Sequence, residues 1–495
     1  MTGTSANGAP GARRFPPGFL WGVSTSAYQI EGAVHEDGRG QSIWDTYSHT
    51  PGKIHGGDTG DIACDSYHRM DEDLSLLSEL GVDGYRFSIA WPRIQPTGRG
   101  AVNERGLDYY RALVAGLRDR GIMPVATVYH WDLPQALEDE GGWANRETAE
   151  RFAEYAQLLA QALGDHVAMW ITMNEPQQAV NQGYRVGTHA PGKTDYGLAA
   201  AATHHLLLGH GLALEAMRSS LPGRTAIGIS LDLHPVRPTS EDALDAAAIL
   251  DAEHNRIFLE PALHGTYPVL ARAELLPPAE LIKPGDMRTI SAPIDFLGLN
   301  YYSPYYVGLG DWDDLRLGES PLPGHPGLVN YAPPEIPKTT MGWLNEPNGL
   351  YDILVALDRE APRLPVFITE NGRANEDYVT PEGDINDLER IAFLEGHLDA
   401  AWRAIQDGVN LVGYFHWSLM DNFEWGRGYQ RRFGLYFVDF GTQRRLAKRS
   451  ARFYSEVART GVLPSSEAML QPSGGELVNG DIARASTARP VPGAI

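Results

Sequence analysis

The stretch Pro365-Val366-Phe367-Ile368-Thr369-Glu370-Asn371-Gly372 is a short apolar run that ends in a carboxylate and a turn. Its β-branched and aromatic residues favour a strand, and Asn-Gly directly after them favours a turn. Residues 386–406 follow with apolar positions spaced mostly for one helical face, and they end near Gly408. This part of the chain therefore predicts a strand followed by a helix.

The same unit recurs along the chain. Apolar runs of strand type occur at residues 19–29, 84–91, 123–131, 168–176, 226–232, 295–302, 365–372 and 411–422. Helical patterns lie between them, among them 70–80 before Gly81, 107–120 before Gly121 and 146–163 before Gly164. Eight alternating units predict one α/β domain over residues 15–462, a (β/α)8 TIM barrel with elaborated rim loops. A doubly wound open sheet is the alternative, but no Gly-x-Gly-x-x-Gly turn follows the first strand.

Three segments fall outside this alternation. Residues 1–14 and 463–495 are rich in small residues and proline, and we expect both to be disordered tails. Residues 303–340 are rich in Gly and Pro, which predicts a long loop on the barrel rim.

Composition excludes several classes of partner. The 495 residues are 43% hydrophobic and 21% charged, as in an ordinary globular protein. A net charge of −22 and a pI near 5.1 argue against binding to nucleic acid or an anionic membrane. The one cysteine, Cys64, allows no intrachain disulfide and is expected to be a buried thiol. No signal peptide or membrane-spanning run is recognised, so a cytoplasmic protein is expected, and its oligomeric state stays open.

In such a barrel, active-site residues lie at the carboxyl ends of the strands. Glu370 occupies that position in one run and Glu175, in Asn174-Glu175-Pro176, occupies it in another. Taken alone, Asn-Gly after Glu370 also suits a hairpin turn with a solvated flank. Two strand-end glutamates in one chain favour an acid/base and nucleophile pair instead.

The other strand ends carry aromatic, amide, imidazole and cationic side chains, a mixture typical of sugar sites, where rings pack on the pyranose and polar groups bind its hydroxyls. Each has an ordinary alternative: Trp417 as core, Arg86 as an ion-pair partner, His130 as a satisfied core histidine. Their joint placement favours a carbohydrate site. The residues are Gln29, Glu31, Arg86, His130, Trp131, Asp132, Asn174, Asn300, Tyr301, Tyr302, His416, Trp417, Glu424 and Trp425.

Two further groups are discounted. His204, His205 and His210 do not share one helical face, so no zinc site is predicted there. A basic cluster near the C-terminus is interpreted as solvated surface; it comprises Arg431, Arg432, Arg444, Arg445, Lys448 and Arg449.

Several segments, in order, resemble glycoside hydrolase family 1, the retaining β-glucosidases, over about residues 15–462. They are Phe19-Leu20-Trp21-Gly22, Tyr28-Gln29-Ile30-Glu31-Gly32, Tyr85-Arg86-Phe87-Ser88-Ile89, Thr172-Met173-Asn174-Glu175-Pro176, Gly298-Leu299-Asn300-Tyr301-Tyr302, Thr369-Glu370-Asn371-Gly372 and the run from His416 to Trp425.

The resemblance implies that Glu370 is the nucleophile and Glu175 the acid/base, with carboxyls roughly 5–5.5 Å apart. Arg86 and Tyr302 are implied to keep Glu370 ionised. The implied sugar-binding residues are Gln29, His130, Trp131, Asn174, Trp343, Trp417, Glu424 and Trp425. The implied substrate is a small β-glucoside or short oligosaccharide, with β-galactosides and β-fucosides as side activities. No metal or organic cofactor is implied.

Four positions differ from the family pattern: Ala90, Arg373, Gln177 and Gln178. Arg373 and the two glutamines put the aglycone preference in doubt, and none of the four removes a catalytic group. The carboxylate of Glu424 would repel a phosphate, which argues against the 6-phospho-β-glycosidase branch. Two other functions stay open. A carbohydrate-binding relative without catalysis would be expected to lack one of the glutamates, and a transglycosidase would use the same residues and differ only in its acceptor.

Overall fold

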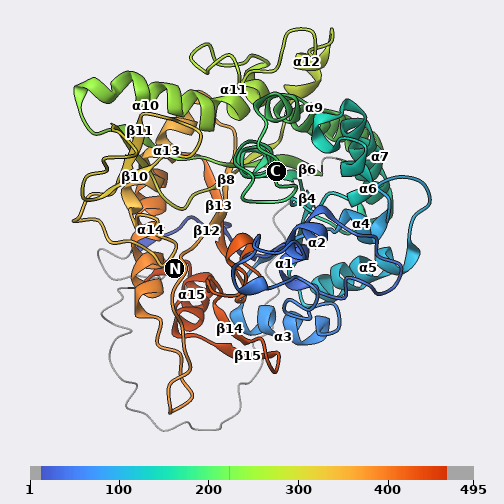
Figure 1. Ribbon diagram of the computed structural model, residues 1–495. Coiled ribbons are helices and arrows are strands. Elements are labelled where there is room, and N and C mark those ends of the chain that lie inside the picture. The colour runs from blue at the N-terminus through green and yellow to red at the C-terminus, as the bar shows by residue number, and fades with distance from the viewer. Residues whose placement is uncertain (1–12, 222, 224, 465–495) are drawn as a thin grey trace, which may run out of the picture.

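Eight parallel strands close into a barrel in the computed structural model, which describes residues 13–464 except 222 and 224. Their order around the barrel is β12-β13-β2-β3-β4-β5-β6-β8 (Figure 1). Each strand lies within one of the eight predicted runs, so the TIM-barrel prediction is confirmed and the open sheet was wrong. The strands are β2 (Leu20–Ser24), β3 (Gly84–Ser88), β4 (Met123–Tyr129), β5 (Met169–Asn174), β6 (Ala226–Asp232), β8 (Phe296–Asn300), β12 (Val366–Asn371) and β13 (Leu411–Trp417).

Side chains contributed only by the strands form a separate apolar cluster. Phe296, Phe367 and Phe415 are its large members, and all three are buried. A Cβ atom at Gly22 would lie 2.2 Å from the Phe415 ring, so β2 needs glycine at this point. The cluster fills the inside of the barrel as a packed core rather than a pore.

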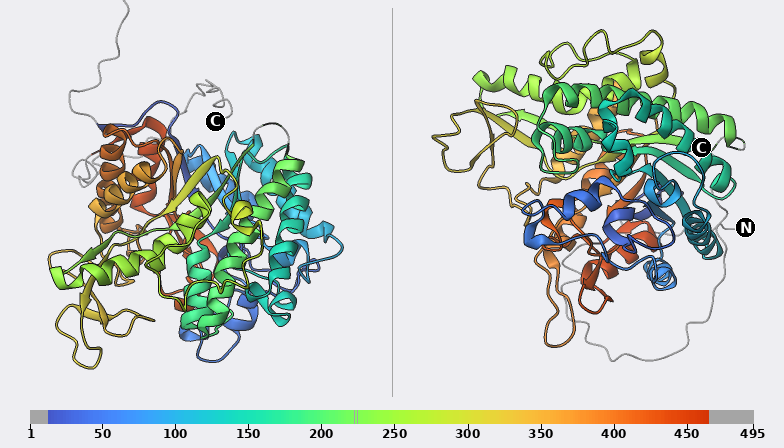
Figure 2. Two further views of the ribbon diagram at one scale, coloured as in Figure 1. Left: turned by 90° about the horizontal axis from the view of Figure 1, so that it is seen from above. Right: turned by 45° about the vertical axis from the view of Figure 1, so that its right-hand side comes forward.

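Helices surround the strands (Figures 1 and 2). The predicted bounds 70–80 and 146–163 are those of α3 and α7, whereas α5 begins three residues before the prediction and α14 two residues after it. Gly81 ends α3 in the left-handed conformation, with φ of 73°, which glycine adopts without strain. None of the helices described is both long and apolar enough to span a bilayer. The longer helices are α3 (Met70–Leu80), α5 (Glu104–Asp119), α7 (Arg146–Leu163), α9 (Tyr196–Ser220), α10 (Leu244–Asp251), α11 (Ile257–His264), α13 (Pro347–Glu360), α14 (Leu388–Gln406) and α15 (Arg449–Thr460). The shorter ones are α1 (Ala27–Ile30), α2 (Ile43–Ser48), α4 (Trp91–Ile94), α6 (Gln135–Asp139), α8 (Pro176–Val180) and α12 (Asp286–Ile290).

The rim segment 303–340 is more regular than predicted. It contains β9 (Tyr305–Leu309), β10 (Glu319–Pro321) and β11 (Leu328–Tyr331), which join β7 (Val236–Pro238) in the order β10-β11-β9-β7. Val307 and Leu322 bury their side chains against α10 in a small core of their own. Strand pairing and this core override the loop-like Gly and Pro content.

The boundaries of the predicted tails shift by one or two residues. Strand β1 (Arg13–Arg14) pairs antiparallel with β16 (Val462–Leu463). Arg13 also forms 3.0 Å ion pairs with Glu395 and Asp399 of α14, partners that a local reading of the sequence cannot show. Pro464 follows β16, and residues 1–12 and 465–495 of the predicted tails lie outside the described residues. A further pair of strands, β14 (Tyr436–Asp439) and β15 (Arg444–Ala447), is antiparallel.

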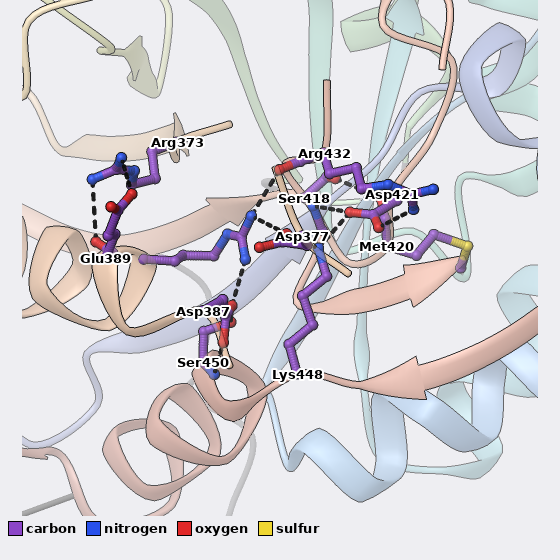
Figure 3. A network of polar contacts seen from close by, with 12 residues as sticks. Arg373, Asp377, Asp387, Glu389, Ser418, Met420, Asp421, Arg432, Lys448 and Ser450 are labelled. Atoms are coloured by element: carbon purple, nitrogen blue, oxygen red, sulfur yellow. Dashed lines mark hydrogen bonds and ion pairs between the residues drawn. The ribbon is translucent and has the colours of Figure 1, made fainter. Parts of the chain in front are cut away.

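The interpretation of the basic cluster as solvated surface was wrong for its buried members. Lys448 has no exposed surface, and its Nζ lies 2.6 Å from both Asp377 and Asp421 (Figure 3). Arg432 adds a 2.7 Å pair with Asp421, and Arg445, also buried, pairs with Asp73. Asp73 and Asp377 lie far from these cations in the chain, and no helical or strand spacing connects Asp421 to Arg432 or Lys448, so the sequence alone did not reveal the pairs.

We expect Lys448→Met to destabilise the protein by about 3–5 kcal/mol, because it leaves two buried carboxylates short of a cation. Chemical denaturation followed by circular dichroism measures the change. Arg444→Met removes an exposed cation four residues earlier and should cost no more than about 0.5 kcal/mol. Equal losses in the two variants would contradict a stabilising role for the buried pairs.

Candidate active site

A cavity of about 950 Å³ opens at the carboxyl ends of the barrel strands. Nine of the twelve predicted site residues line it, and the other three lie behind its wall. The nine are His130, Trp131, Glu175, Tyr302, Trp343, Glu370, Trp417, Glu424 and Trp425. They come from the ends of β4, β5, β8, β12 and β13 and from the segments that follow. The barrel therefore brings residues nearly 300 positions apart in sequence to one site.

Glu370, on β12, is buried, and each of its two carboxyl oxygens accepts a hydrogen bond from a different side chain. Arg86 Nη1 donates to its Oε1 at 2.5 Å, and the Tyr302 hydroxyl donates to its Oε2 at 2.8 Å. Arg86 is itself fixed by bonds to the Thr369 carbonyl and to Thr127. Burial raises the pKa of the Glu370 carboxyl, whereas Arg86 and Tyr302 oppose that rise. These two hydrogen bonds favour the carboxylate form of Glu370 and fix the orientation of its carboxyl group.

Glu175 follows β5 and sits at the start of α8, with a left-handed backbone φ of 45°. A non-glycine residue in this region is strained, and such strain is typical of functional positions. Its Oε1 accepts a 2.6 Å hydrogen bond from Asn300 Nδ2, a neutral donor. Burial, then the negative charges of Asp232 and Glu370, raise the pKa of Glu175 well above its usual value. Glu175 is therefore held protonated beside an anionic Glu370, the division of roles that a general acid and a nucleophile need.

Asn174 links the two glutamates through their partners. Its Oδ1 accepts from Arg86 Nη2 at 2.5 Å and from Asn300 Nδ2 at 3.0 Å. Two donors at the oxygen fix the amide orientation, so its nitrogen faces His130 Nε2 at 3.1 Å. A continuous set of hydrogen bonds thus runs from Glu370 through Arg86, Asn174 and Asn300 to Glu175.

Asn300 is a site residue that the sequence analysis did not single out for a role. It ends β8, and Thr369 Oγ1 donates to its Oδ1 at 2.7 Å, which turns the amide nitrogen towards Glu175. Its strand-end position was the available signal. The same signal marked Asp232, which ends β6 and lines the cavity but was not considered.

His130 lines the cavity, and its two ring nitrogens have different surroundings. Its Nε2 accepts from Asn174, so the proton of the neutral ring lies on Nδ1, which is buried and has no partner among the described residues. Burial, with a smaller contribution from Arg86, lowers the pKa of His130 well below its usual value, so the ring is neutral. A bound hydroxyl group would satisfy the free Nδ1 proton.

Aromatic rings form much of the remaining wall. The rings of Trp131 and Trp425 are 4.7 Å apart, and that of Trp417 lies 5.8 Å from His130 at an interplanar angle of 21°. Trp343 packs 5.2 Å from the Tyr302 ring. Glu424 lies among these rings, where burial and the charge of Glu370 raise its pKa to about 8. Apolar faces beside hydrogen-bonding groups suit the two kinds of surface of a pyranose.

Gln29 does not line the cavity. Its amide nitrogen donates to Asn422 Oδ1 at 3.0 Å and to the Phe423 carbonyl at 2.8 Å, so it supports the segment that carries Glu424. Its predicted contact with a sugar stays a prediction.

Two of the departures from the family pattern have different surroundings. Arg373 turns away from the cavity and pairs with Glu389 at 2.7 Å (Figure 3). Gln178 lines the cavity and donates to Asp232 at 2.6 Å. Of these two positions, only Gln178 can contact a bound aglycone directly.

Comparisons with known proteins agree with one another. The family model described as Glycosyl hydrolase family 1 matches residues 12–462. "Beta-glucosidase A" of Thermotoga maritima is 46% identical over 453 residues, covering 90% of this chain and 98% of its own. A "Bifunctional beta-D-glucosidase/beta-D-fucosidase" of Bifidobacterium breve is 45% identical over 452 residues, covering 89% and 97%. The solved "Family 1 b-glucosidase from Thermotoga maritima" aligns with a TM-score of 0.86 at 44% identity, covering 92% of this chain and 100% of that chain. The beta-glucosidase of the same organism in complex with noeuromycin aligns with a TM-score of 0.85, covering 91% and 100%.

Proposed function

Because the chain belongs to glycosyl hydrolase family 1 and is a β-glucosidase, we propose that it cleaves terminal β-D-glucosyl residues by double displacement, with Glu370 as nucleophile and Glu175 as acid/base. The observation that carries this assignment is the unequal pair of environments. The Glu370 carboxyl accepts hydrogen bonds from a guanidinium and a phenol, whereas the Glu175 carboxyl accepts one, from an amide, among the residues that the structure describes. The first environment favours an anion and the second a neutral acid.

In the first step, a Glu370 oxygen attacks the anomeric carbon while Glu175 gives its proton to the leaving glycosidic oxygen. The C–O bond to the aglycone breaks, and a glucosyl ester forms on Glu370. That ester removes the negative charge of Glu370, one of the causes that keep Glu175 protonated. Glu175 then accepts a proton from water, which attacks the anomeric carbon and releases glucose with retained configuration.

The hydroxyl groups of the glucosyl unit have candidate partners in the cavity. We propose that His130 and the carboxyl of Glu424, which line the cavity, bind these hydroxyls and that Trp417 and Trp425 pack on the sugar ring. Asn174 is the proposed contact of the 2-hydroxyl, where hydrogen bonds tighten in the transition state. The bifunctional relative supports a side activity on β-fucosides, and an activity on β-galactosides stays a prediction.

The stereochemistry of the first product tests the mechanism. Proton nuclear magnetic resonance during hydrolysis of an aryl β-glucoside should show β-glucose first, with α-glucose appearing only by later mutarotation. Initial α-glucose would overturn double displacement. Absence of turnover by folded protein would favour the carbohydrate-binding alternative, and transfer to an added acceptor sugar measures the transglycosidase alternative.

We expect Asn300→Ala to lower kcat/KM about tenfold and to shift the basic limb of its pH profile upwards. Asn300 donates to Glu175 and so favours the carboxylate, which means that its removal raises the pKa of the acid. A higher pKa keeps Glu175 protonated to higher pH. The measurement is kcat/KM against pH, with Asn410→Ala, an amide that bonds only to the Arg363 carbonyl, as a matched control. An unshifted basic limb would show that Asn300 does not act through Glu175.

A cytoplasmic location stays part of the proposal; it fits a chain with a single cysteine, which burial keeps as an unreactive thiol with a raised pKa. Cell fractionation with an antibody to the protein tests it.

A further inference from the structure

Three polar side chains that the proposed hydrolysis does not use converge beside Glu175, two of them buried and the third, His254, partly buried with 12% of its side chain exposed. Asp232 ends β6, His234 follows two residues later, and His254 comes from the π-helical turn between α10 and α11, residues Ala252–Arg256. Asp232 is 3% exposed and His234 is 7% exposed. Asp232 Oδ1, His234 Nε2 and His254 Nε2 are all buried and have no hydrogen-bond partner within the described part of the chain.

The three side chains have the spacing of metal ligands. His234 Nε2 lies 2.9 Å from Asp232 Oδ2, within ion-pair distance, and His254 Nε2 lies 3.9 Å from the same oxygen. One ligand atom from each residue falls within 4.8 Å of the other two. Zinc binds nitrogen and oxygen ligands at about 2.0–2.2 Å in a tetrahedron, which places neighbouring donor atoms roughly 3.3 Å apart. The distances from Asp232 Oδ2 to His234 Nε2 and to His254 Nε2, 2.9 Å and 3.9 Å, lie below and above that value.

Surrounding hydrogen bonds orient two of the three groups. His234 Nδ1 lies 2.5 Å from the Ser303 carbonyl, an acceptor, so this nitrogen carries a proton and donates it. In the neutral ring Nε2 then presents its lone pair to the cluster. Gln178 donates to Asp232 Oδ2 at 2.6 Å and holds the carboxylate from the cavity side. Metal-binding histidines and carboxylates are oriented by such outer partners.

We infer that Asp232, His234 and His254 bind one divalent transition-metal ion of the zinc class at the wall of the cavity. Two imidazoles and one carboxylate favour Zn²⁺ and its neighbours over Mg²⁺ or Ca²⁺, which take mostly oxygen ligands. Asp232 and His234 line the cavity, so the cluster lies at the cavity wall. The ion takes no part in the proposed cleavage; it is a regulatory ligand.

An occupied site would affect the proposed activity. Asp232 and Glu175 line the same cavity, and the charge of Asp232 acts on Glu175. A bound cation adds positive charge beside the proton donor, and we expect Zn²⁺ to inhibit hydrolysis reversibly, with recovery on adding a chelator. This consequence depends on the proposed function, whereas metal binding itself does not.

Equilibrium dialysis of the full chain against Zn²⁺, followed by elemental analysis, tests the site without any substrate. One zinc ion per chain is expected, with affinity reduced at least about 100-fold in His254→Gln. His264→Gln, which removes an exposed histidine paired with Glu360, should bind zinc as the unchanged protein does. Loading with Co²⁺ adds a second readout, because its visible ligand-field absorption reports nitrogen and oxygen ligands and should be lost in His254→Gln.

Failure of wild-type protein to bind zinc stoichiometrically would overturn the inference, and so would equal affinity in the His254→Gln and His264→Gln variants. If His254→Gln does not fold, His234→Asn repeats the test from the other imidazole. Zinc binding without inhibition would keep the site and remove its regulatory role. Hydrolysis that is normal without metal separates a failure of this inference from a failure of the proposed function.

Discussion

Glu370→Ala should lose on the order of 10⁵-fold in kcat for an aryl β-glucoside, because no group remains to form the covalent intermediate. Azide fits the space left by the side chain and can attack the anomeric carbon of the bound substrate directly. That single displacement inverts the configuration, so activity should return with α-glucosyl azide as product. Release of the aryl alcohol measures the rate, and nuclear magnetic resonance identifies the azide.

The exposed Glu389 provides the matched control. Its side chain is 72% exposed and, within residues 13–464, pairs with Arg373 away from the cavity, so Glu389→Ala should keep nearly full activity. A Glu370→Ala protein that remains folded by circular dichroism and still turns over within tenfold of the unchanged enzyme would refute the nucleophile assignment. If the rescued product were the β-glucosyl azide instead, Glu370 would have to be assigned as the acid/base and Glu175 as the nucleophile.

Glu175→Ala should show a loss that depends on the leaving group. Alkyl glucosides and cellobiose need a proton on the departing oxygen, so their cleavage should slow by about 10²–10⁴-fold. The dinitrophenolate of a dinitrophenyl glucoside leaves without that proton, so the glucosyl-enzyme still forms from this substrate. Azide should attack this intermediate in place of the water that Glu175 no longer activates, and give β-glucosyl azide with retained configuration.

The pH profile distinguishes this variant further. In the unchanged enzyme the protonated form of Glu175 is the active acid, so kcat/KM falls as pH rises through its raised pKa. Without Glu175 that basic limb should disappear while the acidic limb, set by ionisation of Glu370, remains. A basic limb that persists unchanged would assign the proton donor to another group.

The strands and most of the candidate site were predictable because both follow from short apolar runs and from the residues directly after them. Each strand of the barrel is a short apolar run, and a parallel barrel gathers whatever follows those runs at one end. That is why Glu175 and Glu370 could be paired before any distance was known. The helix ends at Leu80, Leu163 and Gln406 were predictable, whereas the starts of α5 and α14 were less so, since helix starts depend on capping contacts.

Other features depend on contacts between distant parts of the chain. The burial of Lys448 requires Asp377 and Asp421, which no local pattern connects to it. The sheet around β9 forms because a separate core and pairing with β7 outweigh the Gly and Pro content. The bond from Asn300 to Glu175 and the convergence of Asp232 with two histidines depend on the register of neighbouring strands. Spacing along the chain carries no record of that register.

The pairing of β1 with β16 brings the first and last described strands of the domain together. Arg13 faces Leu463 across two strands, so the first and last described segments leave the molecule side by side. A short covalent link between them would span little distance, and the chain could then be opened at an exposed rim turn without separating any barrel strand from its neighbours. For protein engineering, the described part of the chain is therefore a candidate for circular permutation through a link between β1 and β16.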